Sequence, residues 1–345
     1  YIVLMNINHT IEALENKLCV NSYILKGKII DLDSVTTSAH KFYERLYWNR
    51  SDIYDIIPHG KHIERRDLLE ARLADFALQD YDLDIANIYE NRILPLFKAI
   101  ESNGLYTANG MEHSKYNLFT TTGRPSNSKG GINYAALNKS DGTRERFVSR
   151  FANGSLLEMD FDAYHIRLIA KLVGHHLPPT SVHEEFAKQF YGVKTVTKEE
   201  YKLSKAMSFQ VLYGGVPKEL EGIEYFDKVK AFISGLWDIY NTKGYIQTPI
   251  FKRRLYKRNF NDMKPQKLFN YLIQAYETER NIEVMEKMQK VLSDKSSKLI
   301  LYTYDAFLID IDKSEMHLIK EIEQLMDLPV KMHIGNNYND MKLLT

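Results

Sequence analysis

The chain has 345 residues, enough for one large unit or two domains, and its 44% hydrophobic and 26% charged content is ordinary for a globular protein with a sizeable core. No apolar run approaches membrane-spanning length, so no membrane partner is expected. The single cysteine, Cys19, excludes an internal disulfide and a cysteine-based zinc site and fits a reducing, cytoplasmic location. The formal net charge is +1, so nucleic acid would have to be bound through local basic clusters, which occur at 144–150 and 252–258.

The first 80 residues carry weak signals. Because the chain starts at Tyr1 without a methionine, we expect a trimmed segment or the end of a longer protein. Apolar runs predict strands at 1–5 and 23–32, and apolar periodicity predicts a helix at 65–78. Asp31 and Asp33 follow the second strand and are interpreted as turn residues rather than as a metal pair.

Stronger patterns begin at residue 88, and they come in the following order. Helical spacing at 88–102 ends at Asn103-Gly104, and residues 120–142, rich in Gly, Asn and Pro, predict an ordered loop of the kind that is usually functional. Helices are predicted at 164–173, 199–213, 223–242, 270–292 and 315–326, with strands or hairpins at 156–161, 244–256, 298–311 and 330–334. This mixture without strict alternation predicts the α+β class.

Two aspartates stand at the ends of short apolar runs. Asp160 follows Leu156 to Met159, and Asp305 follows Leu299 to Tyr304. A carboxylate on a buried strand is costly unless it is paired or holds a metal, so the two strands are expected to lie side by side around cations. Two hard cations held in this way can activate a 3′-hydroxyl and stabilise a leaving pyrophosphate. The pattern therefore favours a nucleotidyl-transfer site.

Lys205, Phe209 and Tyr213 recur every four residues in the predicted helix 199–213. They therefore project from nearly one face, where a lysine can neutralise phosphate and two rings can stack on a base and a sugar. An amphipathic helix that buries both rings while Lys205 snorkels to solvent explains the same spacing.

Seven segments, in this order along the chain, together resemble motifs of the family A DNA polymerases, the bacterial DNA polymerase I family, and more closely its compact phage-borne members. These segments are Thr122-Gly123-Arg124, Asp160 to Ala170, Ser181-Val182-His183 with Phe190-Tyr191-Gly192, Lys205 to Gly214, Gly244 to Tyr256, Asn270 with Gln274, and Tyr304-Asp305-Ala306. The resemblance extends from about residue 86 to the end.

The resemblance implies a right-hand polymerase fold with an antiparallel-sheet palm, short helical fingers and a reduced thumb. Residues 1–85 then have an unknown role, 86–175 form the reduced thumb, primer-binding loop and first palm segment, 176–245 the fingers, and 246–345 the second palm segment. It also implies a template-directed DNA polymerase that uses two Mg²⁺ ions, with primer-template DNA and dNTPs as partners. A replisome or processivity partner, in a bacterial or phage-infected host cell, is a further expectation. No Asp-x-Glu proofreading motif precedes the polymerase region, so no exonuclease activity is expected.

Roles are carried over residue by residue. The implied metal ligands are Asp160, Asp305 and the backbone carbonyl of Phe161, and Lys205 joins the two aspartates as a catalytic residue. The implied dNTP-binding residues are His183, Lys205, Phe209, Tyr213, His165 and Tyr201. The implied DNA-binding residues are Arg124, Asn270, Gln274, Arg253 and Arg254.

Several positions depart from the family pattern. His165 stands where the family has a glutamate that helps to exclude a ribose 2′-hydroxyl, and Tyr201 stands where it has an arginine for the triphosphate, for which Lys198 or Lys202 could substitute. Tyr304 and Ala306 replace His and Glu. Asp162 replaces a serine and is interpreted as a solvated structural residue rather than an outer-shell carboxylate, and Arg167 fits a salt bridge at least as well as a substrate contact.

Two other functions fit the same residues. A single-subunit RNA polymerase-like enzyme shares the paired aspartates and the lysine helix, although Phe209 and His165 favour deoxynucleotides. A catalytically degenerate, DNA-binding replisome scaffold has no need of metal ligands, so the presence of Asp160, Asp305 and Lys205 together argues against it. Extension assays with dNTPs and rNTPs separate the three.

Overall fold

The computed structural model describes residues 22–25, 28–31, 85 and 88–344, except 119, 128–131, 139–140, 215, 217, 258–259 and 261. The strand expected at 1–5, the helix expected at 65–78 and Asp33 lie outside these residues. Within the predicted strand region 23–32, β1 (Ser22–Leu25) pairs antiparallel with β2 (Lys28–Asp31).

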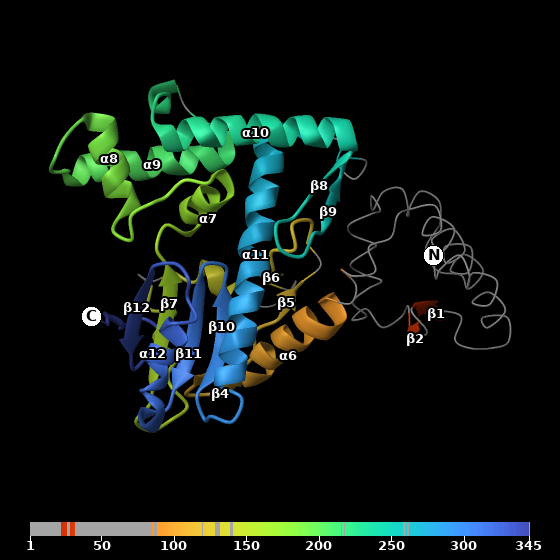
Figure 1. The fold of residues 1–345 in the computed structure, drawn as a ribbon. Coiled ribbons are helices and arrows are strands. Elements are labelled where there is room, and N and C mark those ends of the chain that lie inside the picture. The colour runs from red at the N-terminus through yellow and green to blue at the C-terminus, as the bar shows by residue number, and fades with distance from the viewer. Residues whose placement is uncertain are drawn as a thin grey trace.

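A five-stranded antiparallel sheet forms the lower part of the molecule in Figure 1. Its strand order is β10-β11-β7-β12-β13. These strands are β7 (Ser155–Phe161), β10 (Lys298–Thr303), β11 (Ala306–Ile311), β12 (Val330–Gly335) and β13 (Lys342–Leu343). A strand from the middle of the chain thus lies between strands from its C-terminal part, with helices around them, which is the predicted α+β arrangement.

Three short antiparallel pairs lie outside this sheet. They are β3 (Leu105–Thr107) with β4 (Gly110–Glu112), β5 (Tyr116–Asn117) with β6 (Ser126–Asn127), and β8 (Tyr245–Gln247) with β9 (Arg254–Tyr256). The last pair is the predicted basic hairpin. Single 3-10 turns occur at Tyr134–Ala136, Lys218–Leu220 and Lys313–Glu315.

The helices follow the predicted order with two differences. They are α6 (Leu94–Asn103), preceded by a π-type turn (Tyr89–Ile93), α7 (Tyr164–Val173), α8 (Val182–Tyr191), α9 (Lys198–Gly214), α10 (Glu224–Lys243), α11 (Pro265–Val291) and α12 (Leu318–Glu323). Helix α8 was not predicted, and α11 begins five residues earlier than expected, at a proline, which is well suited to the first helical turn.

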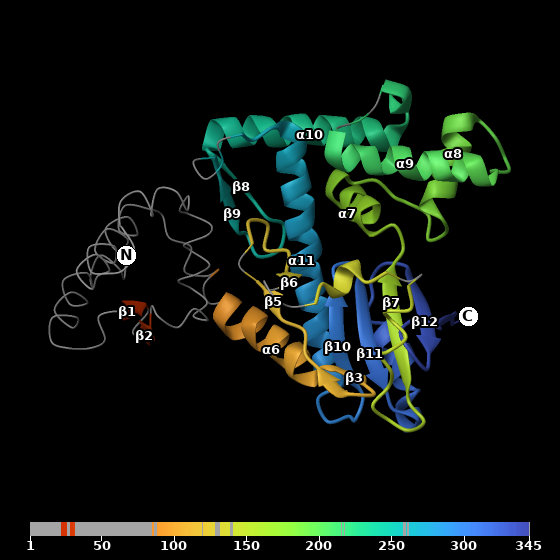
Figure 2. The same ribbon diagram turned by 180° about the vertical axis from the view of Figure 1, so that it is seen from behind.

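The apolar residues divide into clusters that match the two layers seen in Figures 1 and 2. Alternate residues of β7, such as Leu157 and Met159, face α6, α12 and the C-terminal half of α11, while Leu156 faces a smaller cluster on the other side of the sheet. Helices α7 to α10 surround a separate cluster, to which the N-terminal half of α11 contributes residues such as Phe269. Helix α11 therefore belongs to both layers.

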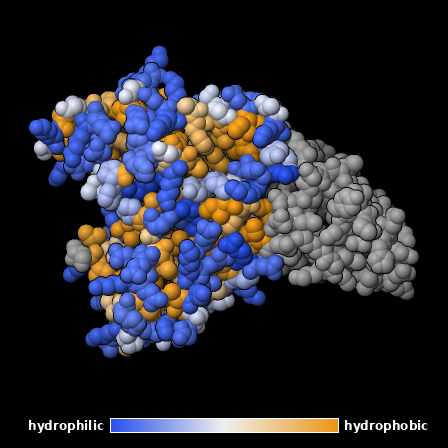
Figure 3. Space-filling model, viewed as in Figure 1, coloured by the Kyte–Doolittle hydropathy of each residue, from blue (hydrophilic) through white to orange (hydrophobic). Residues whose placement is uncertain are grey.

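Polar residues cover much of the face shown in Figure 3, and hydrophobic residues appear between them in separate patches. Across the part of the chain that the structure describes, no helix combines the length and the apolar character needed to cross a membrane.

Candidate active site

Asp160 and Asp305 are brought together by backbone pairing. Asp160 lies opposite Ala306 in the β7–β11 register, and the amide of Phe161 donates a hydrogen bond of 3.0 Å to the carbonyl of Asp305. The neighbour of β7 is β11, so β10, the apolar run before Asp305, lies one strand further away than the sequence suggested. The turn between β10 and β11, in which Tyr304 has φ +67°, brings Asp305 next to the end of β7.

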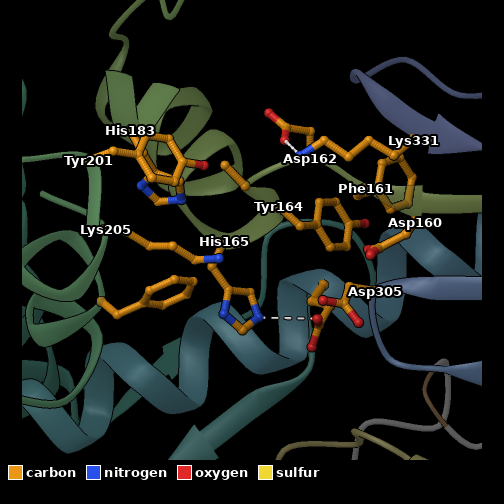
Figure 4. A pocket seen from close by; sticks show the side chains of 13 residues that line it. Asp160, Phe161, Asp162, Tyr164, His165, His183, Tyr201, Lys205, Asp305 and Lys331 are labelled. Carbon is orange, nitrogen blue, oxygen red and sulfur yellow. Dashed lines mark hydrogen bonds and ion pairs between the residues drawn. The ribbon is translucent and has the colours of Figure 1, made fainter. Parts of the chain in front are cut away.

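Both aspartates line one pocket with two distinct walls (Figure 4). We call Asp160, Asp305 and Lys331 the sheet wall, and His183, Tyr201, Lys205 and Phe209, from α8 and α9, the helix wall. Residues 161–165 and Glu277 complete the lining. The sequence analysis predicted that the two aspartates and the four helix-wall residues share one site, and in the structure all six line the same pocket.

The aspartate pair suits hard cations. Burial and the nearby charge of Glu277 raise the pKa of Asp305 above its ordinary value, so the site disfavours negative charge until a cation arrives. No group of three or more metal-binding side chains occurs among the described residues. Mg²⁺ is commonly held by only one or two carboxylates plus substrate phosphates and water, so a pair is sufficient. The carbonyl of Phe161 as a further ligand stays a prediction.

The helix wall is held together by contacts between α8 and α9. Ser204 donates a hydrogen bond of 2.9 Å to the carbonyl of His183, and the His183 ring lies 5.8 Å from that of Phe209 and 5.9 Å from that of Tyr201. Burial, with the neighbouring Lys205 charge, lowers the pKa of His183 to about 4, so the ring is neutral at pH 7. Tyr213 belongs to α9, but its side chain lies outside what the structure describes.

Glu277, which the sequence did not single out, links three parts of the site. It is fully buried in α11, with one oxygen 3.1 Å from His165 Nε2 and the other 2.9 Å from Arg124 Nε. The Arg124 guanidinium in turn lies 3.9 Å from the centre of the Tyr304 ring, next to Asp305. In the position where the family has a glutamate, this chain thus places a histidine that faces a carboxylate from another helix.

The predicted primer-binding loop contacts α11 and the β8–β9 hairpin. Thr122 donates a hydrogen bond of 3.1 Å to Gln274, which donates one of 2.5 Å to Asn270. Arg253 is 4% exposed and donates a bond of 3.0 Å to the carbonyl of Thr121. Its contact with DNA stays a prediction, and what the structure shows is a link between the hairpin and the loop.

The hairpin and the loop also meet at Gly123, whereas Arg254 contacts a residue of its own hairpin. The Arg254 guanidinium lies 5.0 Å from the centre of the Tyr245 ring, within the hairpin. Gly123 has φ +75°, and a Cβ there would lie 2.5 Å from the Arg253 guanidinium, so the close approach of loop and hairpin requires glycine.

A second charged group borders the sheet wall. Asp162 accepts from Lys331 Nζ at 2.5 Å and from the buried Arg167 at 3.3 Å, and Arg167 also donates to the carbonyls of Pro178 and Thr180. Arg167 therefore has the salt-bridge role that the sequence allowed. Lys331 was missed, because a lysine in a short C-terminal strand carries no sequence signal for a site.

No known family model matches the chain. It is similar to DNA polymerase I of Lactococcus lactis subsp. lactis strain IL1403, with 25% identity over 298 residues, 73% of this chain and 34% of that protein. It is also similar to the thermostable DNA polymerase I of Thermus filiformis, with 25% identity over 66% of this chain and 32% of that protein. Both similar proteins are bacterial DNA polymerases I. The chain spans about a third of the length of these relatives.

A solved structure supports the same relationship at the level of the fold. The chain is similar to the POL domain of Pol1 from M. smegmatis, in complex with DNA primer-template and dNTP, with a TM-score of 0.56 and 17% identity over 98% of this chain and 65% of that one. The likeness to this polymerase domain confirms the predicted fold class, an α+β right-hand polymerase fold with an antiparallel palm sheet.

Proposed function

We propose that the chain is a template-directed DNA polymerase that extends a primer 3′-hydroxyl with dNTPs. The observation that carries this proposal is the position of Asp160 and Asp305 on one wall of a pocket whose other wall presents Lys205. Similarity to DNA polymerase I and to a polymerase domain bound to DNA and dNTP adds support. We expect no proofreading exonuclease activity from these residues.

In the proposed reaction the primer 3′-oxygen forms a bond to the α-phosphorus while the bond from that phosphorus to the bridging oxygen breaks. The hydroxyl proton leaves to solvent, and pyrophosphate departs with the electron pair. Two Mg²⁺ ions held by Asp160 and Asp305 would make the 3′-hydroxyl more acidic and stabilise charge on the leaving group. Lys205 holds negative charge on the polyphosphate from the opposite wall, where charge develops during transfer.

The remaining residues position the substrates. Phe209 offers a ring face to the incoming base, and the neutral His183 can donate one hydrogen bond to a phosphate oxygen. Arg124 and Gln274 are donors, and every Watson–Crick pair offers a minor-groove acceptor, so they can sense pair geometry without reading sequence. The ion pair with Glu277 fixes the direction of the Arg124 guanidinium.

Primer extension with purified protein tests the proposal. Asp160→Asn and Asp305→Asn should each abolish extension in Mg²⁺ while primer-template binding persists, because these residues hold metal rather than DNA. Asp238→Asn, an exposed aspartate on α10 away from the pocket, is the matched control and should extend normally. Substantial extension by either pocket variant would exclude the assignment of that residue as a ligand.

Two further variants test the helix wall. Lys205→Ala should reduce incorporation severely, whereas Lys320→Ala, exposed on α12 and outside the pocket lining, should have little effect. Kinetics of Lys205→Ala equal to those of the wild type would mean that α9 is only structural. Parallel reactions with dNTPs and rNTPs distinguish a DNA polymerase from an RNA polymerase-like enzyme, and absence of both activities would favour a scaffold.

A further inference from the structure

Lys331 occupies a position in the pocket that the polymerase resemblance does not assign to any role. In the β7–β12 register it lies directly opposite Asp160, so the two side chains project from the same face of the sheet. It lines the pocket on the sheet wall, across from Lys205 on the helix wall (Figure 4). These two are the lysines among the described residues that line the pocket, and each belongs to a different wall.

Asp162, which pairs with Lys331 in the structure, does not depend on that lysine for a counter-ion. Asp162 is also paired with Arg167, whose buried guanidinium is anchored to the backbone by Pro178 and Thr180. The side chain of Lys331 is 56% exposed, and an ion pair this open to solvent contributes little. The ammonium group can therefore leave Asp162 for a stronger anion without leaving a carboxylate unpaired.

The helix wall supplies little positive charge for such an anion. Among its four residues Lys205 is the lysine, His183 is neutral at pH 7, and Tyr201 has a hydroxyl where the family has an arginine. A triphosphate or pyrophosphate carries several negative charges in a small volume, and a single cation balances only part of them. The remaining cation that lines the pocket is Lys331, beside the aspartate that is proposed to hold metal.

We propose that Lys331 is a polyphosphate-binding residue, which contacts the β- or γ-phosphate of the incoming nucleotide and the pyrophosphate that leaves. The inference rests on the proposed function for its place in the reaction. In the free protein Asp162 holds the ammonium beside the pocket, and the arriving polyphosphate takes it over. The positive charge that the family supplies through an arginine at the position of Tyr201, in the helix wall, is then supplied by Lys331 in the sheet wall.

A double-mutant cycle separates this role from simple neutralisation of Asp162. Lys331→Ala should raise the KM for dNTP and weaken inhibition by pyrophosphate, each by about tenfold, as expected for one lost charge contact. In an Asp162→Asn background the same change should have at least as large an effect, because the lysine still has the phosphates to bind. If the effect disappears there, Lys331 serves only Asp162 and the proposal is overturned.

A second measurement does not require polymerase activity. Binding of inorganic tripolyphosphate to the full chain, followed by calorimetry without DNA, should weaken about tenfold in Lys331→Ala and recover in Lys331→Arg. Lys342→Ala, exposed on the neighbouring strand β13 and outside the pocket lining, should match the wild type. Unchanged tripolyphosphate affinity in Lys331→Ala would overturn the inference while extension by the wild type stands. A loss of affinity in a chain that fails to extend primers would support the site and exclude the proposed function.

Discussion

Replacing Glu277 by glutamine isolates the charge of a carboxylate that is fully buried in α11. Glutamine keeps the size and shape of the side chain, so no cavity forms and the loss is electrostatic. The Glu277 side chain is 1% exposed, and its partners Arg124 and His165 are 25% and 17% exposed. The substitution therefore leaves the guanidinium of Arg124 in a mostly dry site without its counter-ion.

Removing one partner of a buried ion pair costs about 3–5 kcal/mol. Because Arg124 keeps some contact with water and the ring of Tyr304, we expect a cost somewhat below this range, about 2–3 kcal/mol. Glu286→Gln is the matched control on the same helix, since Glu286 pairs with Arg92 at 2.6 Å where both side chains are about a third exposed. Loss of such an exposed pair costs at most about 1 kcal/mol.

Thermal unfolding and urea titration of both variants against the wild type provide the assay. At ~2.1 cal/mol/K of unfolding entropy per residue, the midpoint of a chain of 345 residues shifts by about 1.4 °C per kcal/mol, so the unfolding midpoint of Glu277→Gln should fall by about 3–4 °C, at least twice the shift of Glu286→Gln. The urea slope should stay unchanged, which shows that the loss is one of stability rather than compactness. Equal shifts in the two variants would refute the argument that burial makes the Glu277 contacts important.

Three other predictions address sugar choice, pH and the loop. Phe209→Tyr should relax discrimination against dideoxynucleotides by supplying a hydroxyl, whereas His165→Ala should raise ribonucleotide incorporation, on the order of 10²-fold at most, without changing the dideoxy response. Competition assays with dNTP, rNTP and ddNTP check both, and an unchanged ribonucleotide preference in His165→Ala would place the gate elsewhere. The pKa of His183 is about 4 in the folded chain and about 6.5 when unfolded, so the unfolded state binds the extra proton and stability falls as pH drops from 6.5 to 4. Urea midpoints across this range should fall less steeply in His183→Gln, and parallel curves would contradict the shift. Gly123→Ala should destabilise the chain by about 1–2 kcal/mol because of its positive φ, while Gly235→Ala, in open space on α10, should stabilise it by about 0.5–1 kcal/mol. Calorimetric midpoints that move in the same direction would argue against this reading of Gly123.

The two aspartates could be predicted from sequence because each stands next to an apolar run, where a carboxylate is conspicuous. The spacing of Lys205 and Phe209 likewise predicted a shared helix face, and both line the pocket. The start of helix α8 could also have been predicted, because Ser181 and Glu184 have the spacing of a capping box. In the structure the Ser181 side chain accepts a hydrogen bond from the Glu184 amide.

Glu277 and Lys331 could not be predicted in the same way. Helix α11 is packed against both layers and has buried residues around much of its circumference. The sequence pattern of this helix therefore does not distinguish a buried glutamate from one that faces solvent. Lys331 owes its place to the register of β12 on β7, which pairs residues far apart in the chain. Both depend on tertiary contacts that no local pattern encodes.

Because α11 is packed in both apolar clusters, we expect its two halves to unfold separately. Its N-terminal half is packed among α7 to α10 and its C-terminal half against the sheet, with Gln274 and Glu277 between the two. Local unfolding of the upper layer must therefore release the first half of α11 while the second half stays packed. Amide exchange should show two cooperative units that meet within this one helix, with the slower unit on the side of the sheet. Glu277, which contacts both Arg124 and His165, lies at this boundary.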